Sequence, residues 1–312
     1  MLPVSPRSLN NRRILAGLRT GQSPVANLSR PELYSPEKRK ADLAFFLEAR
    51  GGFFYGKVGT TELLALEHAD RWLRPLWPVA ASWRRAAERL HVDSGFFPVT
   101  REAFENFIII YQAGVRDLDG ICLWQDDPFL RHYERVLAAE LCPRARRITY
   151  LALTSRVLEE LAGLRWLVVS SFPKTMKQQS SKLAEIHRGK SWGPRLQKQG
   201  QAIEFLPCPT FASLAPSPYQ SWSDGLDRLT EAACRVDFDV ALVGAGAWSL
   251  PLLSNLKKMG KRGIHLGGEI QLVFGIKGRR WDHEGIYNEA WVRPDVSETP
   301  AGFMKKENGC YW

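Results

Sequence analysis

Two glycine-rich turns contain the residues best suited to bind a phosphate group. Gly244 and Gly246 follow the apolar run 240–243, and Gly267 and Gly268 follow a second apolar segment. Glycine lets the backbone turn sharply, and free backbone N–H groups at such turns bind anions. Ligands of a βαβ unit bind outside the carboxyl ends of its strands, which is where both turns fall. We therefore expect a phosphate-bearing ligand here, the alternative being that both turns are purely structural.

A second candidate anion site lies near residue 60. Segment 52–58 has the pattern of a strand, Gly59, Thr60 and Thr61 that of a tight turn, and Glu62 lies at the start of a predicted helix. The free N–H groups of a helix N-terminus bind anions. Equally, Thr60 or Thr61 would cap the helix and Glu62 would favour its dipole with no ligand present.

Three basic residues lie close to these turns in the sequence. Lys57 precedes the turn at Gly59, whereas Lys277 and Arg280 follow Gly275 and Gly278. Each would offset the charge of a phosphate, and the alternative for the last two is a solvated basic turn. His265 lies inside a predicted strand, so we expect a packed histidine rather than a general base.

The better-known enzyme signatures are missing from the sequence. Gly244 and Gly246 match only the first two glycines of the dinucleotide fingerprint, Ser249 occupies the third position, and Glu269 fits the acidic ribose contact poorly. We therefore expect neither NAD nor FAD. No Ser-His-Asp order, HExxH motif or Walker A motif is present.

Composition narrows the class of protein. The 312 residues are 45% hydrophobic, enough for a large core, and 43 Lys and Arg against 33 Asp and Glu give a formal net charge of +10. This charge favours anionic partners, but it is dispersed and no zinc finger or helix-turn-helix accompanies it, so we expect no nucleic-acid partner. The absence of a signal-peptide or membrane-spanning pattern predicts a cytoplasmic protein, and five widely spaced cysteines predict free thiols.

The second half of the chain predicts a parallel sheet. Strands are expected at 165–171, 202–207, 240–243 and 263–268, with helices at 175–187, at 224–234 and between Gly246 and Gly260. Earlier helices are expected at 38–49, 100–114 and 129–141. Strands that alternate with helices indicate an α/β fold with a Rossmann-like, largely parallel sheet flanked by helices.

The two ends of the chain differ in character. Residues 1–37 contain several prolines and little periodicity, so we expect an N-terminal extension before a single domain at 38–312. The chain ends on Tyr311 and Trp312, and exposed aromatic surface is normally buried. We expect this tail to dock back on the domain.

Six short motifs carry a family resemblance. GKVGTTE, GAGAW, HLGG, FGIKGRRW, YNEAW and the terminal GCYW together resemble bacterial glycosyltransferases of the GT-D fold, including members associated with exopolysaccharide and capsule synthesis. The similarity runs from about Phe45 to Trp312, and its C-terminal part is the more specific. The resemblance implies transfer of a sugar from a nucleoside-diphosphate-sugar donor to a glycan or lipid-linked glycan acceptor.

The resemblance also bears on a metal cofactor. Members of the family carry an Asp-X-Glu motif, associated with a divalent metal and the donor diphosphate, after an Arg-Phe-Gly lead. Here Lys57, Val58 and Gly59 form the lead, Thr60 replaces the Asp, and Glu62 matches the Glu. Glu62 is thus the expected Mg²⁺ or Mn²⁺ ligand or donor contact, with general base as the alternative, and Lys57 is the fixed charge that would neutralise the diphosphate.

Together these observations predict one site. Its catalytic residues are Glu62 and Lys57, and its donor-binding residues are Gly59, Thr60, Thr61, Gly244, Gly246, Trp248, Gly267, Gly268, Lys277, Arg280, Asn288 and Trp291, with Trp248 or Trp291 stacking on the sugar. Two alternatives remain open: another nucleotide-dependent transferase, or a non-catalytic domain that binds glycan or nucleotide or scaffolds a synthesis complex. Peripheral association with the inner membrane face or with such a complex is a further expectation.

Overall fold

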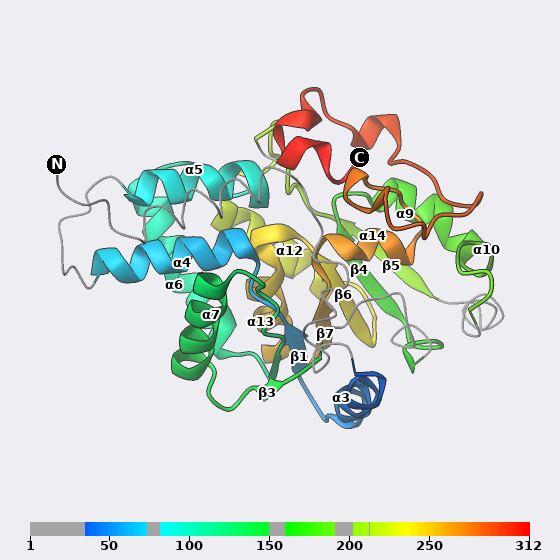
Figure 1. The fold of residues 1–312 in the computed structure, drawn as a ribbon, viewed down its shortest axis with the longest axis horizontal. Helices are drawn as coiled ribbons and strands as arrows, with labels where there is room; N and C mark the ends of the chain where they lie inside the picture. Colours follow the sequence, from blue (N-terminus) through cyan, green and yellow to red (C-terminus); the bar gives the residue numbers. More distant parts are fainter. Residues whose placement is uncertain (1–34, 74–81, 150–159, 191–201, 212) are drawn as a thin grey trace.

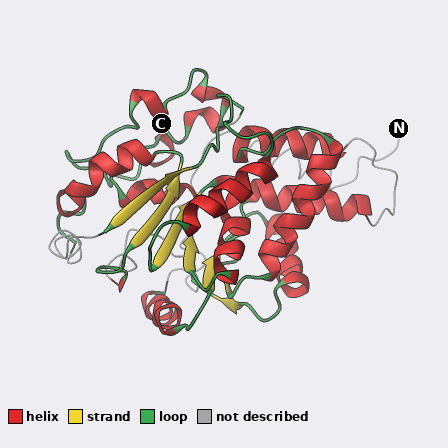
Figure 2. Ribbon diagram, turned by 180° about the vertical axis from the view of Figure 1, so that it is seen from behind, coloured by secondary structure: helices red, strands yellow, loops and turns green. Residues whose placement is uncertain are grey.

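The central element is a parallel sheet of seven strands in the order β3-β2-β1-β7-β6-β4-β5. The computed structural model describes residues 35–73, 82–149, 160–190, 202–211 and 213–312. Helices cover both faces of the sheet, as Figures 1 and 2 show. The predicted α/β, largely parallel fold is therefore confirmed. Within the described segments, no helix is both long and apolar enough to span a bilayer.

The strands are short, and most helices follow the predicted segments. The strands are β1 (Phe53–Gly56), β2 (Gly120–Ile121), β3 (Arg146–Arg147), β4 (Trp166–Ser170), β5 (Ile203–Pro207), β6 (Val240–Gly244) and β7 (Arg262–His265). The longer helices are α3 (Pro36–Glu48), α4 (Thr60–Leu73), α5 (Ser82–Ser94), α6 (Arg101–Arg116), α7 (Pro128–Leu141), α12 (Trp222–Cys234) and α13 (Ser249–Lys258). Residues 1–34 of the predicted extension lie outside the described residues.

Side-chain alternation along the strands divides the core into two layers. In β4, Leu167 and Val169 pack with α4 to α7, α12 and α13, whereas Trp166 and Val168 pack with α3, α9 (Pro173–Gln179), α14 (Ile270–Val273) and the chain end. Successive side chains of a strand point to opposite faces, so a strand covered on both sides must be apolar throughout. All five residues of β4 are buried.

Two predicted elements have different bounds in the structure. The helix expected at 175–187 is broken into α9 (Pro173–Gln179), a 3₁₀ turn (Ser180–Lys182) and α10 (Leu183–Ile186). The strand expected at 263–268 ends at His265. Gly267 adopts the left-handed conformation, with φ of 63°, which ends the extended chain and leads through a 3₁₀ turn into α14 (Ile270–Val273).

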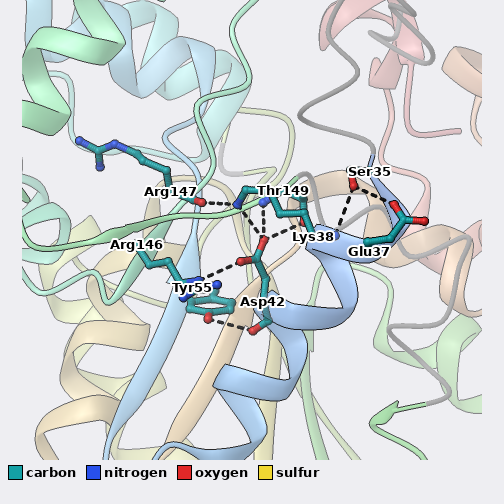
Figure 3. A network of polar contacts seen from close by, with 8 residues as sticks. All are labelled: Ser35, Glu37, Lys38, Asp42, Tyr55, Arg146, Arg147 and Thr149. Carbon is teal, nitrogen blue, oxygen red and sulfur yellow. Dashed lines mark hydrogen bonds and ion pairs between the residues drawn. The ribbon is translucent and has the colours of Figure 1, made fainter.

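A buried carboxylate fastens α3 to the far edge of the sheet, as Figure 3 shows. Asp42 is fully buried and accepts hydrogen bonds from Arg146 Nε at 2.9 Å and from Thr149 N and Oγ1 at 2.8 and 3.0 Å. The Tyr55 hydroxyl in β1 donates to the Asp42 carbonyl at 2.9 Å. Burial raises the pKa of Asp42, but hydrogen bonds from Thr149 and Arg146 outweigh it and leave the pKa below its ordinary value.

The C-terminal segment packs onto the sheet's second layer. Trp312 is buried against Phe172 and Phe211, and its indole N–H donates to the Glu298 carbonyl at 3.0 Å. The Glu298 carboxylate accepts hydrogen bonds from the N–H groups of Lys174 and Thr175, so it caps the first turn of α9 from more than 120 residues away in sequence. This docking places residues 306–311 beside the carboxyl ends of the strands.

Candidate functional site

A cavity of about 520 Å³ opens at the carboxyl ends of the strands. Three of its walls are the turns that follow β1, β6 and β7, which are neighbouring strands in the sheet. From β1 the chain moves outward to β2 and β3, and it returns on the other side of β1 with the remaining strands. Such a reversal of strand order leaves a crevice where ligands bind in open α/β sheets, and the volume suits a small molecule.

The structure brings most of the predicted residues together. Residues that line the cavity are Lys57, Gly59, Thr60, Thr61, Glu62, Gly244, Gly246, Gly267, Gly268 and Arg280. Gly59 and Gly244, which are 185 positions apart, therefore share one cavity. Four predicted residues lie outside it, namely Trp248, Lys277, Asn288 and Trp291.

Trp248 is a core residue. Its side chain is wholly buried, its indole N–H donates to the Trp222 carbonyl at 2.9 Å, and its ring stacks on that of Trp222 with centroids 6.3 Å apart. The expectation that Trp248 stacks on a sugar is wrong, because no face of the ring is accessible. The position of Trp248 at the start of the predicted helix could equally have indicated a core residue.

The other three excluded residues support neighbouring structure. Asn288 donates through Nδ2 to the carbonyls of Glu185 and Ile186 at 3.0 and 3.1 Å. Trp291 is buried, and its indole N–H donates to the Ile186 carbonyl at 3.3 Å. Both therefore satisfy carbonyls at the end of α10. The Lys277 ammonium lies over the Tyr287 ring, 5.6 Å from its centroid. These side chains hold the segment after α14 in place and do not contact the cavity.

Close packing explains the glycines of the turn after β6. A Cβ on Gly244 would lie 2.4 Å from the Gly267 carbonyl oxygen, and one on Gly246 would lie 2.8 Å from the Ser94 carbonyl oxygen. Any side chain at either position would collide with backbone. The structural alternative for this turn is thus supported by direct contacts, and the same contacts draw the turns after β6 and β7 and the end of α5 together around the cavity.

The turn after β1 buries an acidic side chain. The Glu62 carboxylate folds back over Gly59, and a Cβ on Gly59 would lie 2.0 Å from Glu62 Oε2. Burial raises the pKa of Glu62, while hydrogen bonds from Ser94 and from its own backbone N–H oppose the rise. The Thr60 hydroxyl donates to Gln125 Oε1 at 3.1 Å. Both side chains of the altered motif are thus already engaged with protein groups.

Another wall of the cavity is the loop between β2 and α7. The fully buried Glu134 carboxylate accepts the backbone N–H groups of Trp124 and Gln125 at 3.3 and 3.2 Å. The Trp124 indole N–H donates to the Val58 carbonyl at 2.8 Å, and the Lys57 ammonium lies 5.0 Å from the Trp124 ring centroid. This loop therefore positions Lys57 at the edge of the cavity.

His265 is neutral in this environment. Its pKa is lowered to about 3, mainly by burial and also by the Lys57 charge, while a hydrogen bond to the Lys57 carbonyl opposes the shift. Its Nδ1 lies 2.9 Å from that carbonyl, to which the ring N–H donates. The predicted role as a packed histidine agrees with this geometry, because the side chain ties the end of β7 to the end of β1.

Arg280 reaches the cavity from the segment after α14. Its guanidinium donates to Glu307 at 2.8 Å and lies 4.1 Å from the Tyr311 ring centroid and 5.3 Å from that of Trp281. Burial lowers the pKa of Arg280, but Tyr311, Cys310 and Glu307 outweigh that effect and raise it above its ordinary value. A cation held between aromatic faces and a carboxylate keeps a fixed orientation.

A second buried cation comes from the chain end. Lys306 is 2% exposed, its ammonium donates to the Thr210 carbonyl at 2.9 Å, and it lies 4.5 Å from the Phe211 ring centroid. Burial lowers the pKa of Lys306, whereas Glu307 and Asp93 raise it. Lys306 and Glu307 both line the cavity, as does Asp93 at the end of α5.

The residues present do not form a metal site by themselves. Among the described residues, no group of three or more His, Cys, Asp and Glu lies close enough to hold a metal ion. Glu62 is the one carboxylate of the altered motif, and Mg²⁺ prefers several oxygen ligands in near-octahedral geometry. A metal ion here would depend on oxygen atoms supplied by a bound phosphate.

Sequence reasoning missed several residues of the cavity. Asp93, Ser94, Gln125, Lys306, Glu307 and Tyr311 line it without having been predicted. The expected docking of the tail pointed towards Tyr311. Nothing in the sequence distinguishes the buried Lys306 from its exposed neighbour Lys305, because both lie in one charged run.

Comparison with known proteins gives limited similarity. No protein-family model matches the chain, and no curated protein matches it. Two solved structures of the domain of unknown function 1792 are similar in shape, one of them selenomethionine-substituted. The first is 15% identical with a TM-score of 0.38 and covers 79% of this chain and 86% of its own. The second, described as having a distinct glycosyltransferase fold, is 15% identical with a TM-score of 0.36 and covers 83% of this chain and 96% of its own. At these values, neither similarity tells us what this chain does.

Proposed function

We propose that the chain is a glycosyltransferase that moves a sugar from a nucleoside-diphosphate-sugar donor to a glycan or lipid-linked glycan acceptor. One observation supports this most directly: Lys57, Arg280, Lys306 and the first turn of α4 converge on a single cavity at the carboxyl ends of parallel strands. The three basic side chains would contact the phosphate oxygens of a diphosphate, and the six carboxylates that also line the cavity, Glu62, Asp93, Asp126, Asp127, Glu269 and Glu307, would face the sugar. The sequence motifs that resemble GT-D glycosyltransferases point the same way.

Each part of the cavity has a role in this proposal. Lys57, Arg280 and Lys306 would offset the charge of the diphosphate as it leaves the sugar. The cavity carboxylates, including Glu62, Asp93 and Glu307, would accept hydrogen bonds from sugar hydroxyls. In place of Trp248 and Trp291, the cavity-lining rings of Trp124, Phe211 and Tyr311 would provide flat faces for a base or a sugar.

Nucleotide binding tests the proposal with matched controls. We would titrate UDP, GDP and CMP, then their sugar conjugates, into the wild type and the variants Arg280→Met and Lys306→Met. The adjacent residues Arg279 and Lys305 are exposed, so Arg279→Met and Lys305→Met remove the same charge beside the cavity. We expect at least a tenfold loss of affinity for a diphosphate in the first pair only. Equal affinities in all four variants, or no nucleotide binding, would contradict the proposal.

A divalent metal stays a prediction within this proposal. Repeating the titration with and without Mn²⁺, on the wild type and on Glu62→Ala, tests it. Stronger binding of a nucleoside diphosphate with Mn²⁺, lost in Glu62→Ala, would support a metal held jointly by Glu62 and the phosphates. Binding that is independent of Mn²⁺ would leave the cationic side chains as the diphosphate partners.

The alternative of a non-catalytic binding domain has one observation in its favour. Thr60 replaces the motif's Asp, and its hydroxyl is engaged with Gln125. Binding of a nucleotide sugar without any release of nucleotide would favour this alternative. Binding of ATP or phosphoenolpyruvate in preference to all nucleotide sugars would favour a phosphoryl or pyruvyl transferase. A cytoplasmic location, the role in surface polysaccharide synthesis, and association with the inner membrane face or a synthesis complex are further parts of the proposal.

A further inference from the structure

We propose that Asp93 is the general base that removes the proton from the acceptor hydroxyl. This assignment rests on the glycosyltransferase function proposed above. It replaces the alternative in which Glu62 is the base.

The first support is the position of Asp93. It is the penultimate residue of α5, it lines the cavity, and it is 6% exposed. The next residue, Ser94, packs its backbone carbonyl against Gly246, where a Cβ would approach to 2.8 Å. This contact holds the end of α5 beside the turn after β6. Asp93 is therefore fixed in the cavity wall, next to the turn after β6.

The second support is the set of charges around the carboxylate. Arg89, one turn earlier in α5, forms an ion pair with Asp93. Lys306 and Glu307 from the chain end and Glu62 from α4 also act on it. The pKa of Asp93 is raised to about 7 in total: burial is the largest cause, Glu307 and Glu62 also raise the pKa, and Arg89 and Lys306 lower it. A base works best when its pKa lies near the working pH, because it is then both deprotonated and basic.

Two other residues that line the cavity, Glu62 and His265, are less suitable. The Glu62 carboxylate accepts hydrogen bonds from Ser94 and from its own N–H and is folded against Gly59, so it has a structural role in the turn. The His265 ring is tied to the Lys57 carbonyl, and its pKa of about 3 makes it a weak base. Asp93 lies in the cavity wall, and its raised pKa makes it a stronger base than an ordinary aspartate.

The proposed step is a single displacement. The Asp93 carboxylate takes the proton of the acceptor hydroxyl while that oxygen forms a bond to the anomeric carbon. The bond from the anomeric carbon to the diphosphate oxygen breaks, and its electron pair leaves with the diphosphate, whose charge is offset by Arg280 and Lys306. Protonated Asp93 then releases its proton to solvent. Water acts as the acceptor when no sugar acceptor is present, which gives slow hydrolysis of the donor.

Donor hydrolysis provides the test. Release of UDP or GDP from UDP-glucose and GDP-mannose would be measured from pH 5 to pH 9. We expect the wild-type rate to rise through about pH 7, because the deprotonated carboxylate is the active form. We expect Asp93→Asn to lose at least 100-fold in kcat with donor affinity within threefold, and to lose this pH dependence. Asp227→Asn, an exposed carboxylate in α12, is the matched control.

A second variant separates a base from a merely structural residue. Arg89→Gln removes the charge that lowers the pKa of Asp93, so the rising limb of the pH profile should move to higher pH while the limiting rate persists. An active wild type together with an equally active Asp93→Asn overturns the assignment of the base alone. An unmoved limb in Arg89→Gln also counts against the base. A wild type that releases no nucleotide from any donor overturns both the transferase and its base.

Discussion

Glu62 Oε2 occupies the place where a side chain on Gly59 would begin, since a Cβ built there would lie only 2.0 Å away. The two residues therefore pack directly against each other, and only a glycine at position 59 leaves space for the carboxylate. The turn after β1 resembles an anion-binding turn in sequence, yet in the structure its acidic side chain closes over its own first residue. The Glu62 carboxylate is therefore buried within the turn rather than exposed to solvent.

The first prediction concerns that pair. Gly59→Ala should destabilise the protein by about 1–3 kcal/mol, because the new methyl group overpacks against the carboxylate. In a Glu62→Ala background the same change should cost much less, since the clash is removed. Urea unfolding of the two single variants and the double variant measures this coupling. Strictly additive effects would show that the carboxylate moves freely away from Gly59.

The second prediction concerns the edge of the sheet. Asp42→Ala should lower the free energy of unfolding at neutral pH by about 2–4 kcal/mol, because it leaves Arg146 and buried Thr149 donors without their acceptor. Asp227→Ala, at an exposed site, should change it by less than about 0.5 kcal/mol. Chemical unfolding of both variants checks the difference.

Acid should weaken the contribution of Asp42. Its folded-state pKa lies below the ordinary 3.8, so its stabilisation is present above that pH and is lost as the pH falls through the folded-state pKa. The difference between the wild type and Asp42→Ala should therefore shrink below about pH 4. A difference that grows on acidification would contradict the network.

The third prediction links Asp93 to stability. Its pKa rises from 3.8 to about 7 on folding, so the native state binds a proton more tightly than the unfolded state between these values. The wild type should lose stability as the pH rises from 5 to 8, whereas Asp93→Asn, which mimics the protonated form, should not. The gain in Tm from Asp93→Asn should be greater at pH 8 than at pH 5 by roughly 3–5 °C, equivalent to about 2–3 kcal/mol. Scanning calorimetry at both values checks it, and a gain confined to pH 5 would refute it.

The fourth prediction separates two tryptophans. Trp248→Phe should destabilise the protein by about 1–3 kcal/mol through lost packing and a lost hydrogen bond, while leaving nucleotide affinity unchanged. Trp124→Leu, at the cavity wall, should weaken nucleotide binding with a smaller effect on stability. Calorimetric titration with UDP or GDP, beside thermal unfolding, measures both. Weaker binding in Trp248→Phe alone would restore the residue to the site.

Sequence alone was sufficient to predict the fold class and several elements. The apolar runs within segments 165–171 and 240–243 predicted buried parallel strands, because a strand covered on both faces must be apolar throughout. The helix after Thr100 followed from apolar residues at helical spacing, and the stop at Gly260 followed from a glycine that adopts φ of 77°. These are local rules, and each depends on residues close together in the chain.

The carboxyl ends of the strands were likewise predictable as the place for a site, because parallel strands present those ends at one edge. The glycine turns after β6 and β7 and the turn after β1 all meet there. What these glycines contact was less predictable. A glycine at position 244 or 246 is expected whether a phosphate or a neighbouring carbonyl approaches it. The structure places carbonyls there.

Only the tertiary structure decided which charged groups are buried together. Asp93, Lys306 and Glu62 come from three distant segments, and their pKa values shift because folding removes water from all of them at once and leaves them facing one another. No local pattern marks Lys306 apart from Lys305, or Asp93 apart from an ordinary helix-terminal acid. The sequence determined the sheet and the edge at which a ligand would bind, whereas long-range packing determined which side chains meet there and in what protonation state.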